Sequence, residues 1–565
     1  MTDDKGGCDN RARFCGMESG VYLDQRRRER EQQAGFWSGE IITRYLDRSV
    51  FEHPDALALA CYRVEQDQET EFTFAQLQDR VNRVAGGLRR LGVCRGDVVS
   101  FQLPNCWEFV VMVLACVRVG AVGNPLMPIF RARELEFMLN RAQSSVLVVP
   151  AVFRRFDYQA MAAQLQQRLP SLRHIVVVGG AGENSFERLL LDEDNLHDLP
   201  ETALLEADDI MKIMFTSGTT GEPKGVMHTS NTMLTALAVA AERLQLRGDD
   251  ILFMPSPFAH SIGYIYGVLM STYLGIPLVL MDIWNIERAL DLIQRYRATY
   301  SVAAPTFLSD IINYPGLQQQ DLHSLRLFLA SGAPVPPALV DEAGQRLGTN
   351  IITGWGMTEA CLVTTVLPGK DSAGIGTDGI PVRCSEVRIV DDNNNELPRN
   401  TPGNLQCRGS TLFVGYFKRP DLYDVDGEGW FNTGDLATMN EAGYISIMAR
   451  DKDIIIRGGE NIPVVEVEAL TLTMPQVRDV AVVGMPDPRL GERACAFVVL
   501  RPGQTLTLKE MTEFLNSHKL SRHYLPERLE LIKELPRTAS GKVLKYVLRD
   551  MAMTRDNTPE AGTSA

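Results

Sequence analysis

Short apolar runs alternate with longer amphipathic stretches over most of the chain. From about residue 96, VVSFQL predicts a strand and WEFVVMVLACV a helix, and VLVVP (146–150) and HIVVV (174–178) predict further strands. The alternation returns with ILFM (251–254), PLVLM (277–281), YSVAA (300–304), LRLFLAS (325–331) and NIITGWG (350–356). This order is typical of parallel sheets covered by helices. We therefore expect an α/β protein with two α/β sheets in one large unit.

The pattern changes toward the C-terminus. Between residues 386 and 416 the short β runs EVRIV and NLQCRG flank a turn-rich segment, which favours an antiparallel or barrel-like subdomain. Farther along, VRDVAVVGM predicts a strand, and one helical face carries Leu508, Met511, Leu515 and His518. We predict an N-terminal domain over residues 1–451, with two α/β sheets and the β subdomain, and a small mobile α+β C-terminal domain over 452–565.

Composition narrows the function classes. The net charge of −14 over 565 residues argues against broad nucleic-acid binding, so anionic substrates must be caught locally. The ten cysteines are scattered without a C-x-x-C pair, which fits a reducing cytoplasm. The eight histidines form no H-E-x-x-H cluster, so any metal is expected to arrive with a phosphate ligand, as Mg²⁺ does.

No membrane-spanning or export segment is expected. The N-terminus lacks an apolar signal core, and the longest apolar stretch, residues 109–117, is too short to cross a bilayer. That stretch suggests a buried helix that begins with a capping box formed by Asn105 and Glu108. A peripheral membrane contact and a homo-oligomer are both left open.

The stretch TSGTTGEPKG, residues 216–225, suggests a loop that holds phosphates. Glycines let the backbone aim successive N–H groups at one point, and hydroxyls and one lysine add further donors. The residues concerned are Thr216, Ser217, Gly218, Thr219, Thr220, Gly221 and Lys224. The strand IMKIMF precedes the loop, and a helix with Met233 and Leu237 on its apolar face is expected to follow it. The Walker spacing is absent, which disfavours an ordinary P-loop NTPase.

Three further clusters carry polar residues where strands are expected to end. In GWGMTEA, Trp355 has the shape to stack on a purine and Glu359 the charge to bind Mg²⁺. In TGD, an aspartate at a tight turn, Asp435, suits the hydroxyls of a ribose. In PRTASGK, we expect Lys542 to lie on a mobile loop. Taken singly, each has an ordinary structural interpretation: a buried aromatic, a turn cap and a surface charge.

Together, in this order, the motifs resemble the adenylate-forming superfamily of acyl-CoA synthetases, adenylation domains and luciferases. Residues 216–225 match its AMP-binding signature, and GWGMTE, TGD, ARDKDIIIRGGENI and PRTASGK follow in the expected order, so the resemblance covers roughly residues 40–550. Within that superfamily the chain most resembles short- or medium-chain and cyclohexanecarboxylate-type acyl-CoA ligases. The resemblance implies two half-reactions: a carboxylate and ATP form an acyl-adenylate and pyrophosphate, and coenzyme A then displaces AMP.

The resemblance also implies residue roles. The loop and Lys224 would hold the triphosphate, Glu359 would bind Mg²⁺ and Thr358 would approach the α-phosphate. The adenine would lie against Gly332, Ala333, Pro334, Trp355, Gly356 and Met357, and Asp435 and Arg450 would grip the ribose. Lys542 would bridge the acyl carboxylate and the nucleotide during adenylation. Lys452 would serve as the hinge, and rotation of the C-terminal domain would bring Gly458 and Gly459 to the coenzyme A channel.

His260 matches the place where the family has a histidine or aromatic group near the acyl carboxylate. The acyl pocket is expected to draw on Ser261, Gly263, Tyr264, Ala304, Thr306, Ala330, Gly354, Met357 and Cys361. Two positions depart from the family pattern, Ala449 before the ribose arginine and Asn404 in the β subdomain. The first makes the fit around Arg450 the weaker part of the comparison.

Three functions stay open at this point. The first is an acyl-CoA ligase for a small or medium-chain carboxylic acid, linear or alicyclic, with a place in fatty acid metabolism. The second is an adenylating enzyme that loads a carrier protein, and the third is an inactive nucleotide-binding protein. An α-amino acid substrate is disfavoured, because Phe258-Ala259-His260-Ser261 lacks the aspartate that would pair with its ammonium group.

Overall fold

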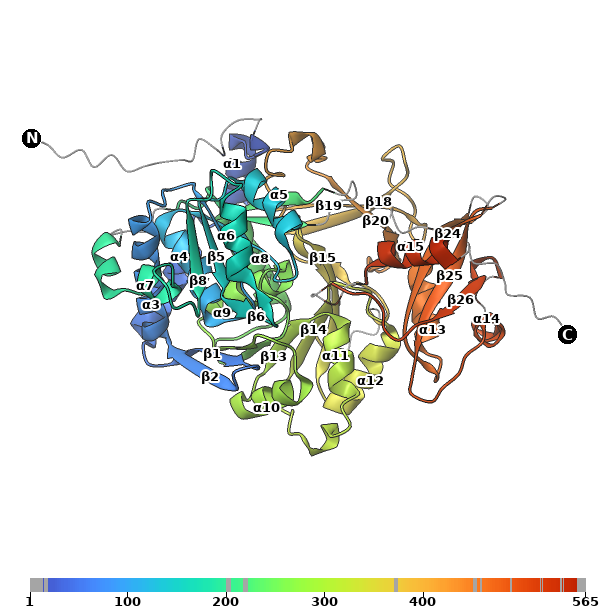
Figure 1. The fold of residues 1–565 in the computed structure, drawn as a ribbon. Helices are drawn as coiled ribbons and strands as arrows, with labels where there is room; N and C mark the ends of the chain where they lie inside the picture. Colours follow the sequence, from blue (N-terminus) through green and yellow to red (C-terminus); the bar gives the residue numbers. More distant parts are fainter. Residues whose placement is uncertain are drawn as a thin grey trace, which may run out of the picture.

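A large part and a smaller C-terminal part make up the molecule. The computed structural model describes residues 14, 19–199, 205–216, 222–369, 374–450, 455–457, 460–487, 490–518, 520, 522–538, 541 and 543–555, with the backbone alone at 449, 450, 456, 460, 461, 491, 523, 554 and 555. Figure 1 shows the elements from β22 onward, coloured orange to red, beside the rest of the chain.

The first sheet of the large part has six strands in the order β10-β9-β4-β3-β5-β8. They are β3 (Val98–Phe101), β4 (Val122–Pro125), β5 (Val146–Pro150), β8 (His174–Val178), β9 (Ile210–Thr216) and β10 (Lys224–Thr229). All neighbouring strands run parallel except β10, which pairs antiparallel with β9. Helices α3 (Phe74–Arg90), α4 (Trp107–Val119), α5 (Ala132–Ala142), α6 (Tyr158–Gln166) and α8 (Ser230–Arg243) accompany it.

The second sheet has nine strands in the order β17-β16-β15-β14-β13-β11-β12-β1-β2. They are β1 (Leu57–Arg63), β2 (Gln68–Thr73), β11 (Leu252–Met254), β12 (Leu278–Met281), β13 (Tyr300–Ala303), β14 (Leu327–Ser331), β15 (Asn350–Met357), β16 (Cys361–Thr365) and β17 (Ile380–Pro381). Helices α10 (Ile286–Tyr296), α11 (Pro305–Ile312) and α12 (Pro337–Leu347) follow its strands. The prediction of two α/β sheets in one unit is confirmed.

Helix α4 is almost entirely buried, as its sequence predicts. The prediction of a capping box formed by Asn105 and Glu108 is wrong. The N-cap of α4 is Cys106, without a side-chain hydrogen bond. The Asn105 amide instead donates to the Ser256 carbonyl at 2.9 Å and accepts the Phe258 N–H at 2.7 Å. Glu108 is 2 % exposed and pairs with Arg63. Tertiary contacts therefore take up both polar groups that the local pattern assigned to the helix end.

The remaining elements of the large part connect and cover the sheets. They are α1 (Gln25–Gln33), α2 (Ile42–Glu52), β6 (Val152–Phe153), β7 (Phe156–Asp157), α7 (Phe186–Leu190), the 3₁₀ helices η3 (Glu193–Asp198), η5 (Leu317–Gln319) and η6 (Pro420–Leu422), the π-helix η4 (Ile262–Leu269) and α9 (Met270–Leu274). The π-helix is the only one among the described residues, and such turns recur at functional sites.

The predicted β subdomain is present as an antiparallel sheet. Its strands are β18 (Ser385–Val390), β19 (Gly403–Gly409), β20 (Phe431–Met439) and β21 (Ile445–Arg450). Asp435 lies within β20 rather than at the tight turn that its sequence suggests. It is 2 % exposed, so its carboxylate belongs to a buried site and not to a solvent-facing cap.

Residues 455–555 form an α+β unit with its own apolar cores. Its strands are β22 (Ile455–Arg457), β23 (Glu460–Ile462), β24 (Val477–Asp487), β25 (Gly491–Leu500) and β26 (Arg528–Leu531), and its helices are α13 (Val464–Leu472), α14 (Leu508–Ser517), the 3₁₀ helix η8 (Arg522–Tyr524) and α15 (Lys545–Arg555). Two core clusters, one on each side of its sheet, draw only on these residues. Met511 and Leu515 are buried as predicted, whereas His518 lies beyond the end of α14 and is exposed. The domain boundary between residues 451 and 452 stays a prediction, because both lie outside the described residues.

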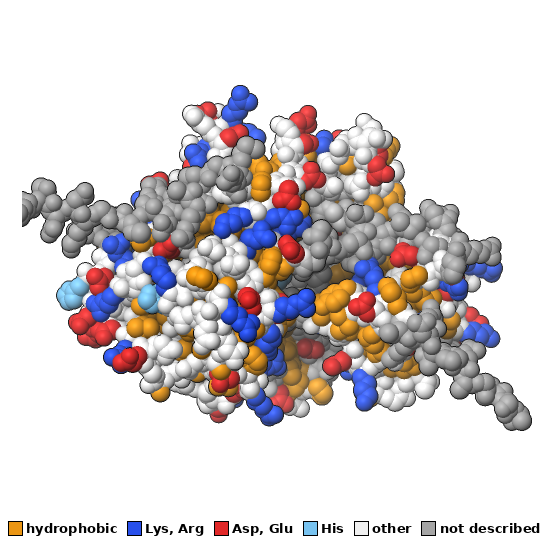
Figure 2. Space-filling view, turned by 45° about the horizontal axis from the view of Figure 1, so that its top comes forward, with side chains coloured by type: hydrophobic (Ala, Val, Ile, Leu, Met, Phe, Trp, Pro, Cys, Tyr) orange, Lys and Arg blue, Asp and Glu red, His pale blue; other side chains and the backbone are white. Residues whose placement is uncertain are grey.

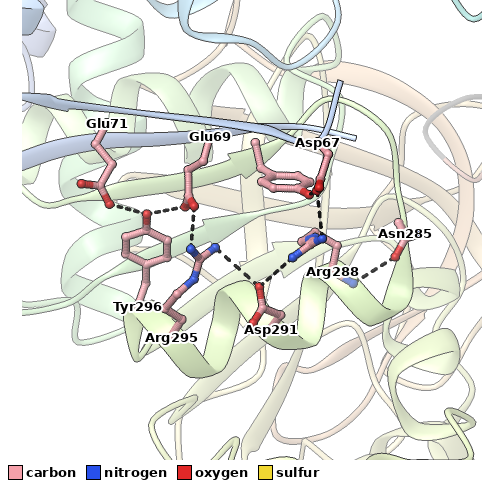
Figure 3. Close-up of polar contacts among 9 residues, drawn as sticks. Asp67, Glu69, Glu71, Asn285, Arg288, Asp291, Arg295 and Tyr296 are labelled. Carbon is pink, nitrogen blue, oxygen red and sulfur yellow. Dashed lines mark hydrogen bonds and ion pairs between the residues drawn. The ribbon is translucent and has the colours of Figure 1, made fainter. Parts of the chain in front are cut away.

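A polar network attaches the edge strand β2 to helix α10 (Figure 3). The Tyr296 hydroxyl contacts the carboxylates of Glu69 and Glu71, and Arg295 pairs with Glu69 at 2.5 Å. Burial and the two carboxylates raise the pKa of Tyr296. The Tyr296 hydroxyl therefore stays protonated. Glu69 and Glu71, whose charges keep the edge strand β2 from pairing with another strand, are thus held in place by side chains of α10.

We expect Tyr296→Phe to lower the free energy of unfolding by about 1 kcal/mol, because the edge carboxylates lose their neutral donor. Urea unfolding of the variant measures this effect. Tyr546→Phe is the control, since Tyr546 is 62 % exposed. Equal stability of both variants would contradict a fastening role for Tyr296.

Candidate active site

The ends of the predicted phosphate loop lie opposite each other. Thr216 of β9 pairs with Lys224 of β10, so the loop closes an antiparallel hairpin. A strand, and not the expected helix, follows the loop: α8 begins only at Ser230. The predicted helix dipole is therefore not directed at this loop. Ser217, Gly218, Thr219, Thr220 and Gly221 lie outside the described residues.

Lys224 is connected to Glu359 through Tyr416. The Lys224 ammonium lies 5.1 Å from the centre of the Tyr416 ring, within cation–π range. The Tyr416 hydroxyl donates to the Glu359 carboxylate at 2.8 Å, and Glu359 is 8 % exposed. Burial and the charge of Glu359 raise the pKa of Tyr416, so the hydroxyl remains a donor. Sequence reasoning missed Tyr416; its only signal is an aromatic residue in the apolar run FVGYF.

A tight turn between β15 and β16 holds Thr358 and Glu359. A Cβ at Gly356 would lie 2.1 Å from the Cys361 carbonyl oxygen, so only glycine allows the strands to approach this closely. Cys361 has φ 60°, an uncommon conformation for a residue with a side chain. The Thr358 hydroxyl accepts a hydrogen bond from Ser261 at 3.0 Å, and its carbonyl lies 2.8 Å from the Nε2 atom of His228.

On the other side of β15, Trp355 contacts Asp435. The indole N–H donates to the Asp435 carboxylate at 3.0 Å, and Trp355 is 8 % exposed within the apolar core of the β subdomain. Asp435 pairs across the sheet with Arg450, whose side chain lies outside the described residues. Asp378, another residue that the sequence did not single out, is nearby. Burial, and then the charge of Asp435, raise its pKa to about 6.

The predicted adenine-lining loop leaves the end of β14, next to β15. Its residues are Gly332, Ala333 and Pro334, and Gly332 and Pro334 are exposed. The preceding Ser331 hydroxyl donates to the Gly354 carbonyl at 2.8 Å. This bond places the loop beside the strand that carries Trp355, Gly356 and Met357. The carboxyl ends of neighbouring strands thus meet at one edge of the sheet.

His260 precedes the π-helix η4 on the side of Thr358. Its Nδ1 atom accepts the N–H of Ile262 at 3.3 Å. In the neutral ring the proton therefore resides on Nε2. Ser261, the next residue, makes the contact with Thr358 described above.

The C-terminal part reaches the large part at Gly541. A Cβ at Gly541 would lie 2.6 Å from the Thr306 hydroxyl oxygen and 3.5 Å from the Ala304 Cβ atom, and Gly541 has φ +87°. Ala304 and Thr306 are two of the residues expected to line the acyl pocket. The predicted residues Lys542, Lys452, Gly458 and Gly459 lie outside the described residues.

Lys212 is a buried cation that sequence reasoning passed over. It lies within the apolar strand β9, is 0 % exposed, and its ammonium has no hydrogen-bond partner among the described residues. The ammonium lies 5.0 Å from the centre of the Tyr264 ring. Burial lowers the pKa of Lys212 to about 8. A lysine inside IMKIMF is the sequence signal that could have found it.

Several of the predicted site residues are thus connected by contacts in the described part of the structure. A chain of contacts runs from Lys224 through Tyr416 to Glu359. The strand and turn that hold Glu359 also carry Thr358 and Trp355, and the Trp355 indole contacts Asp435 of β20. Figure 2 shows Lys and Arg side chains gathered on the face of the large part next to the C-terminal part. Among the described residues no group of three His, Cys, Asp or Glu could hold a metal ion by itself. None of the described helices is long and apolar enough to cross a membrane.

A hairpin that closes the predicted phosphate loop, a buried carboxylate and a second unit beside the sheet are features of the class of nucleotide-activating enzymes. The chain matches the family model described as AMP-binding enzyme over residues 46–417, and the AMP-binding enzyme C-terminal domain over 466–542. It belongs to the AMP-binding enzyme family, within the adenylate-forming superfamily.

Known relatives place the chain more narrowly. It is 36 % identical to the medium-chain fatty-acid–CoA ligase of Escherichia coli K12, over 95 % of each chain. It is 32 % identical to the human mitochondrial medium-chain acyl-CoA ligase ACSF2, covering 86 % of this chain and 83 % of that one. Among solved structures it resembles the anthranilate CoA ligase AuaEII in complex with anthranoyl-AMP, with a TM-score of 0.83 and 27 % identity over 92 % of this chain and 98 % of that one. ATP-bound MatB from Rhodopseudomonas palustris has a TM-score of 0.80 and 26 % identity, over 91 % and 99 %.

The protein is therefore an acyl-CoA synthetase, an AMP-forming acid–thiol ligase. It uses ATP and coenzyme A and forms the thioester through an acyl-adenylate.

We expect Lys212→Met to stabilise the fold at neutral pH by up to about 3 kcal/mol, because it replaces an unpaired buried ammonium by an apolar side chain of similar size. The Lys212 pKa falls from 10.5 to about 8 on folding, so the unfolded chain binds more protons between these values. The advantage of the variant is thus full below about pH 8 and fades as the pH rises toward 10.5. Thermal unfolding at several pH values measures it.

Lys509→Met serves as the matched control, because the Lys509 side chain is 83 % exposed. A Lys212→Met variant that unfolds more easily than the parent at pH 7 would show that the ammonium has a stabilising partner.

Proposed function

We propose that the enzyme activates a medium-chain carboxylic acid, linear or alicyclic, and transfers it to coenzyme A. The observation that carries this proposal is the continuous set of contacts from Lys224 through Tyr416 to Glu359, with Thr358 and Asp435 held by the same strand and turn. The medium-chain relatives support the choice of acid.

In this proposal each group acts on a different part of ATP. The loop and Lys224 hold the phosphates, and Asp435 accepts hydrogen bonds from the ribose hydroxyls. Thr358 is positioned by the Ser261 hydroxyl to approach the α-phosphate, where the acid's carboxylate attacks and pyrophosphate leaves. His260 lies beside that point and orients the carboxylate. The groups are preorganised, which is how electrostatic stabilisation lowers the barrier of phosphoryl chemistry.

Glu359 suits a Mg²⁺ ion that arrives with the nucleotide. It is a single buried carboxylate with one tyrosine donor, and Mg²⁺ in nucleotide sites is held by one or two carboxylates together with substrate phosphates. When bound, the ion neutralises charge on the phosphates. The protein's own part is to hold the carboxylate in place through the Tyr416 hydroxyl.

Lys542 serves the adenylation step in this proposal. Its neighbour Gly541 lies against Thr306, at the edge of the expected acyl pocket. After adenylation the C-terminal domain turns about Lys452, and Gly458 and Gly459 take a place along the path of coenzyme A. The separate cores of the C-terminal part support a unit that moves as a body.

A cytoplasmic location, the absence of nucleic acid among its partners, a peripheral membrane contact and a homo-oligomer stay predictions. The Escherichia coli relative supports the first of these, although other relatives are named as mitochondrial.

The proposal is tested by incubating the purified enzyme with ATP, Mg²⁺ and a panel of linear and alicyclic acids, with and without coenzyme A. Pyrophosphate, AMP and thioester are measured. We expect all three products with medium-chain acids. Pyrophosphate without thioester would indicate an enzyme that loads a carrier protein, and no product from any acid would contradict the proposal.

We expect Lys542→Ala to reduce adenylate formation by at least about a hundredfold and to leave thioester formation from supplied acyl-AMP nearly unchanged, because the lost charge acts only in the first step. Single-turnover assays of each half-reaction measure the two rates separately.

Gly541→Ala tests the contact of the C-terminal part with Thr306. The added methyl group would meet the Thr306 hydroxyl in a conformation that disfavours alanine. We expect the same selective loss of adenylation. Equal loss of both half-reactions in the two variants would contradict a domain rotation between the steps.

A further inference from the structure

The Lys212 ammonium is buried without a compensating charge. Among the described residues no carboxylate pairs with it and no polar atom accepts a hydrogen bond from it. The ammonium lies over the face of the Tyr264 ring, 5.0 Å from the ring centre. An unpaired buried charge costs several kcal/mol, and groups of this kind are concentrated at functional sites.

The described titratable groups nearest Lys212 are uncharged near neutral pH. His228 lies opposite it on β10, and burial, followed by the charge of Lys212, lowers the pKa of His228 far below its usual value. Cys361 faces it from β16, and burial raises the pKa of this thiol to about 12. On η4, burial raises the pKa of Tyr264 and of Tyr266. Among the residues that the structure describes, the region therefore carries one positive charge with no carboxylate paired to it.

Lys212 lies next to Met214 on the same face of β9, and Met214 contacts Ser261 near Thr358. On β9, Thr216, Met214 and Lys212 share one face, because side chains alternate along a strand. The Ser261 hydroxyl, which donates to Thr358, also lies 3.1 Å from the Met214 sulfur. Lys212 lies two residues beyond Met214, about 7 Å farther from the phosphate loop.

Residues expected to line the acyl pocket also extend from Thr358 toward Lys212. Ser261 stands at the reactive end of η4, and Tyr264, whose ring the ammonium faces, follows one helical turn later. Cys361, which interacts electrostatically with Lys212, is a second expected lining residue. A substrate held by its carboxylate near Thr358 and extended along η4 would thus bring its far end toward the ammonium.

We propose that Lys212 binds the distal end of the acyl substrate and selects acids that carry a second carboxylate there. This inference rests on the proposed function and narrows its substrate class from medium-chain acids to medium-chain dicarboxylic acids. A second carboxylate forms a charge-assisted hydrogen bond with the ammonium, whereas a terminal methyl group leaves the charge unpaired. Most of this selectivity comes from rejection of the acid that ends in a methyl group, because that acid leaves the buried ammonium unpaired.

The test compares acids of equal length that differ only at the far end. Hexanoate, octanoate and decanoate are paired with hexanedioate, octanedioate and decanedioate, and kcat/KM is measured for each pair. For at least one length we expect the diacid to be favoured by about tenfold or more in the parent enzyme. We expect Lys212→Met to lose at least about tenfold of that preference, with the monoacid unchanged or improved.

Lys509→Met is the control for loss of a lysine charge, and it should keep the preference of the parent enzyme. The pH dependence supplies a second readout. Because the Lys212 pKa is about 8, the diacid preference in kcat/KM should fall as the pH rises through this value in the parent enzyme, while the monoacid shows no such change.

Each outcome separates this inference from the proposed function. Thioester formation that favours methyl-ended acids at every length, or a Lys212→Met variant that changes both members of a pair equally, would overturn the role of Lys212 alone. Failure of every acid of both kinds to yield thioester would overturn the proposed function itself.

Discussion

The close approach of β15 and β16 at Gly356 is the constraint on which the candidate site depends. Position 356 admits no side chain, so the two strands pack closely there, and the residues on either side of it are directed to three different parts of the molecule. Trp355 reaches the β subdomain through Asp435, Thr358 meets Ser261 at η4, and Glu359 receives the Tyr416 hydroxyl. One short hairpin therefore joins the second α/β sheet, the antiparallel sheet and the phosphate-loop hairpin. Groups that would act on different parts of a nucleotide are held by a single rigid turn, as preorganised catalysis requires.

Several buried titratable groups lie near this turn, and burial shifts the pKa of each toward its uncharged form. Tyr416 remains a proton donor beside a carboxylate, and burial beside Asp435 raises the pKa of Asp378. Lys212 has a charge that no described residue pairs with. The unpaired charge of Lys212 lowers the stability of the empty protein relative to an apolar replacement. Such groups are common where ligands supply the missing interaction, and stability is then exchanged for selectivity.

The C-terminal part has its own cores and meets the expected acyl region at Gly541. A unit with complete cores loses little apolar burial when it turns relative to its neighbour, so motion between the two parts is the physical default. The same surface can then present different residues to the site at different steps. This division suits a reaction in which the acid's carboxylate first attacks the α-phosphate, and a thiol afterwards attacks the carbonyl carbon of the resulting adenylate and displaces AMP.

The sequence by itself determined the parallel strands, the large helix α4, the β subdomain and the family, because these follow from hydrophobic periodicity and from motifs whose spacing is local. It also predicted Lys224, Thr358, Glu359 and Asp435 as members of one site, and this assignment stays a prediction. It assigned a helix after the phosphate loop, a capping box to Asn105 and Glu108, and a tight turn to Asp435, and the structure has a strand, tertiary hydrogen bonds and a strand interior instead. Tyr416, Asp378 and Lys212 acquire their properties only in the folded chain. Burial and the charges of residues distant in sequence set their protonation, and no local pattern contains either quantity.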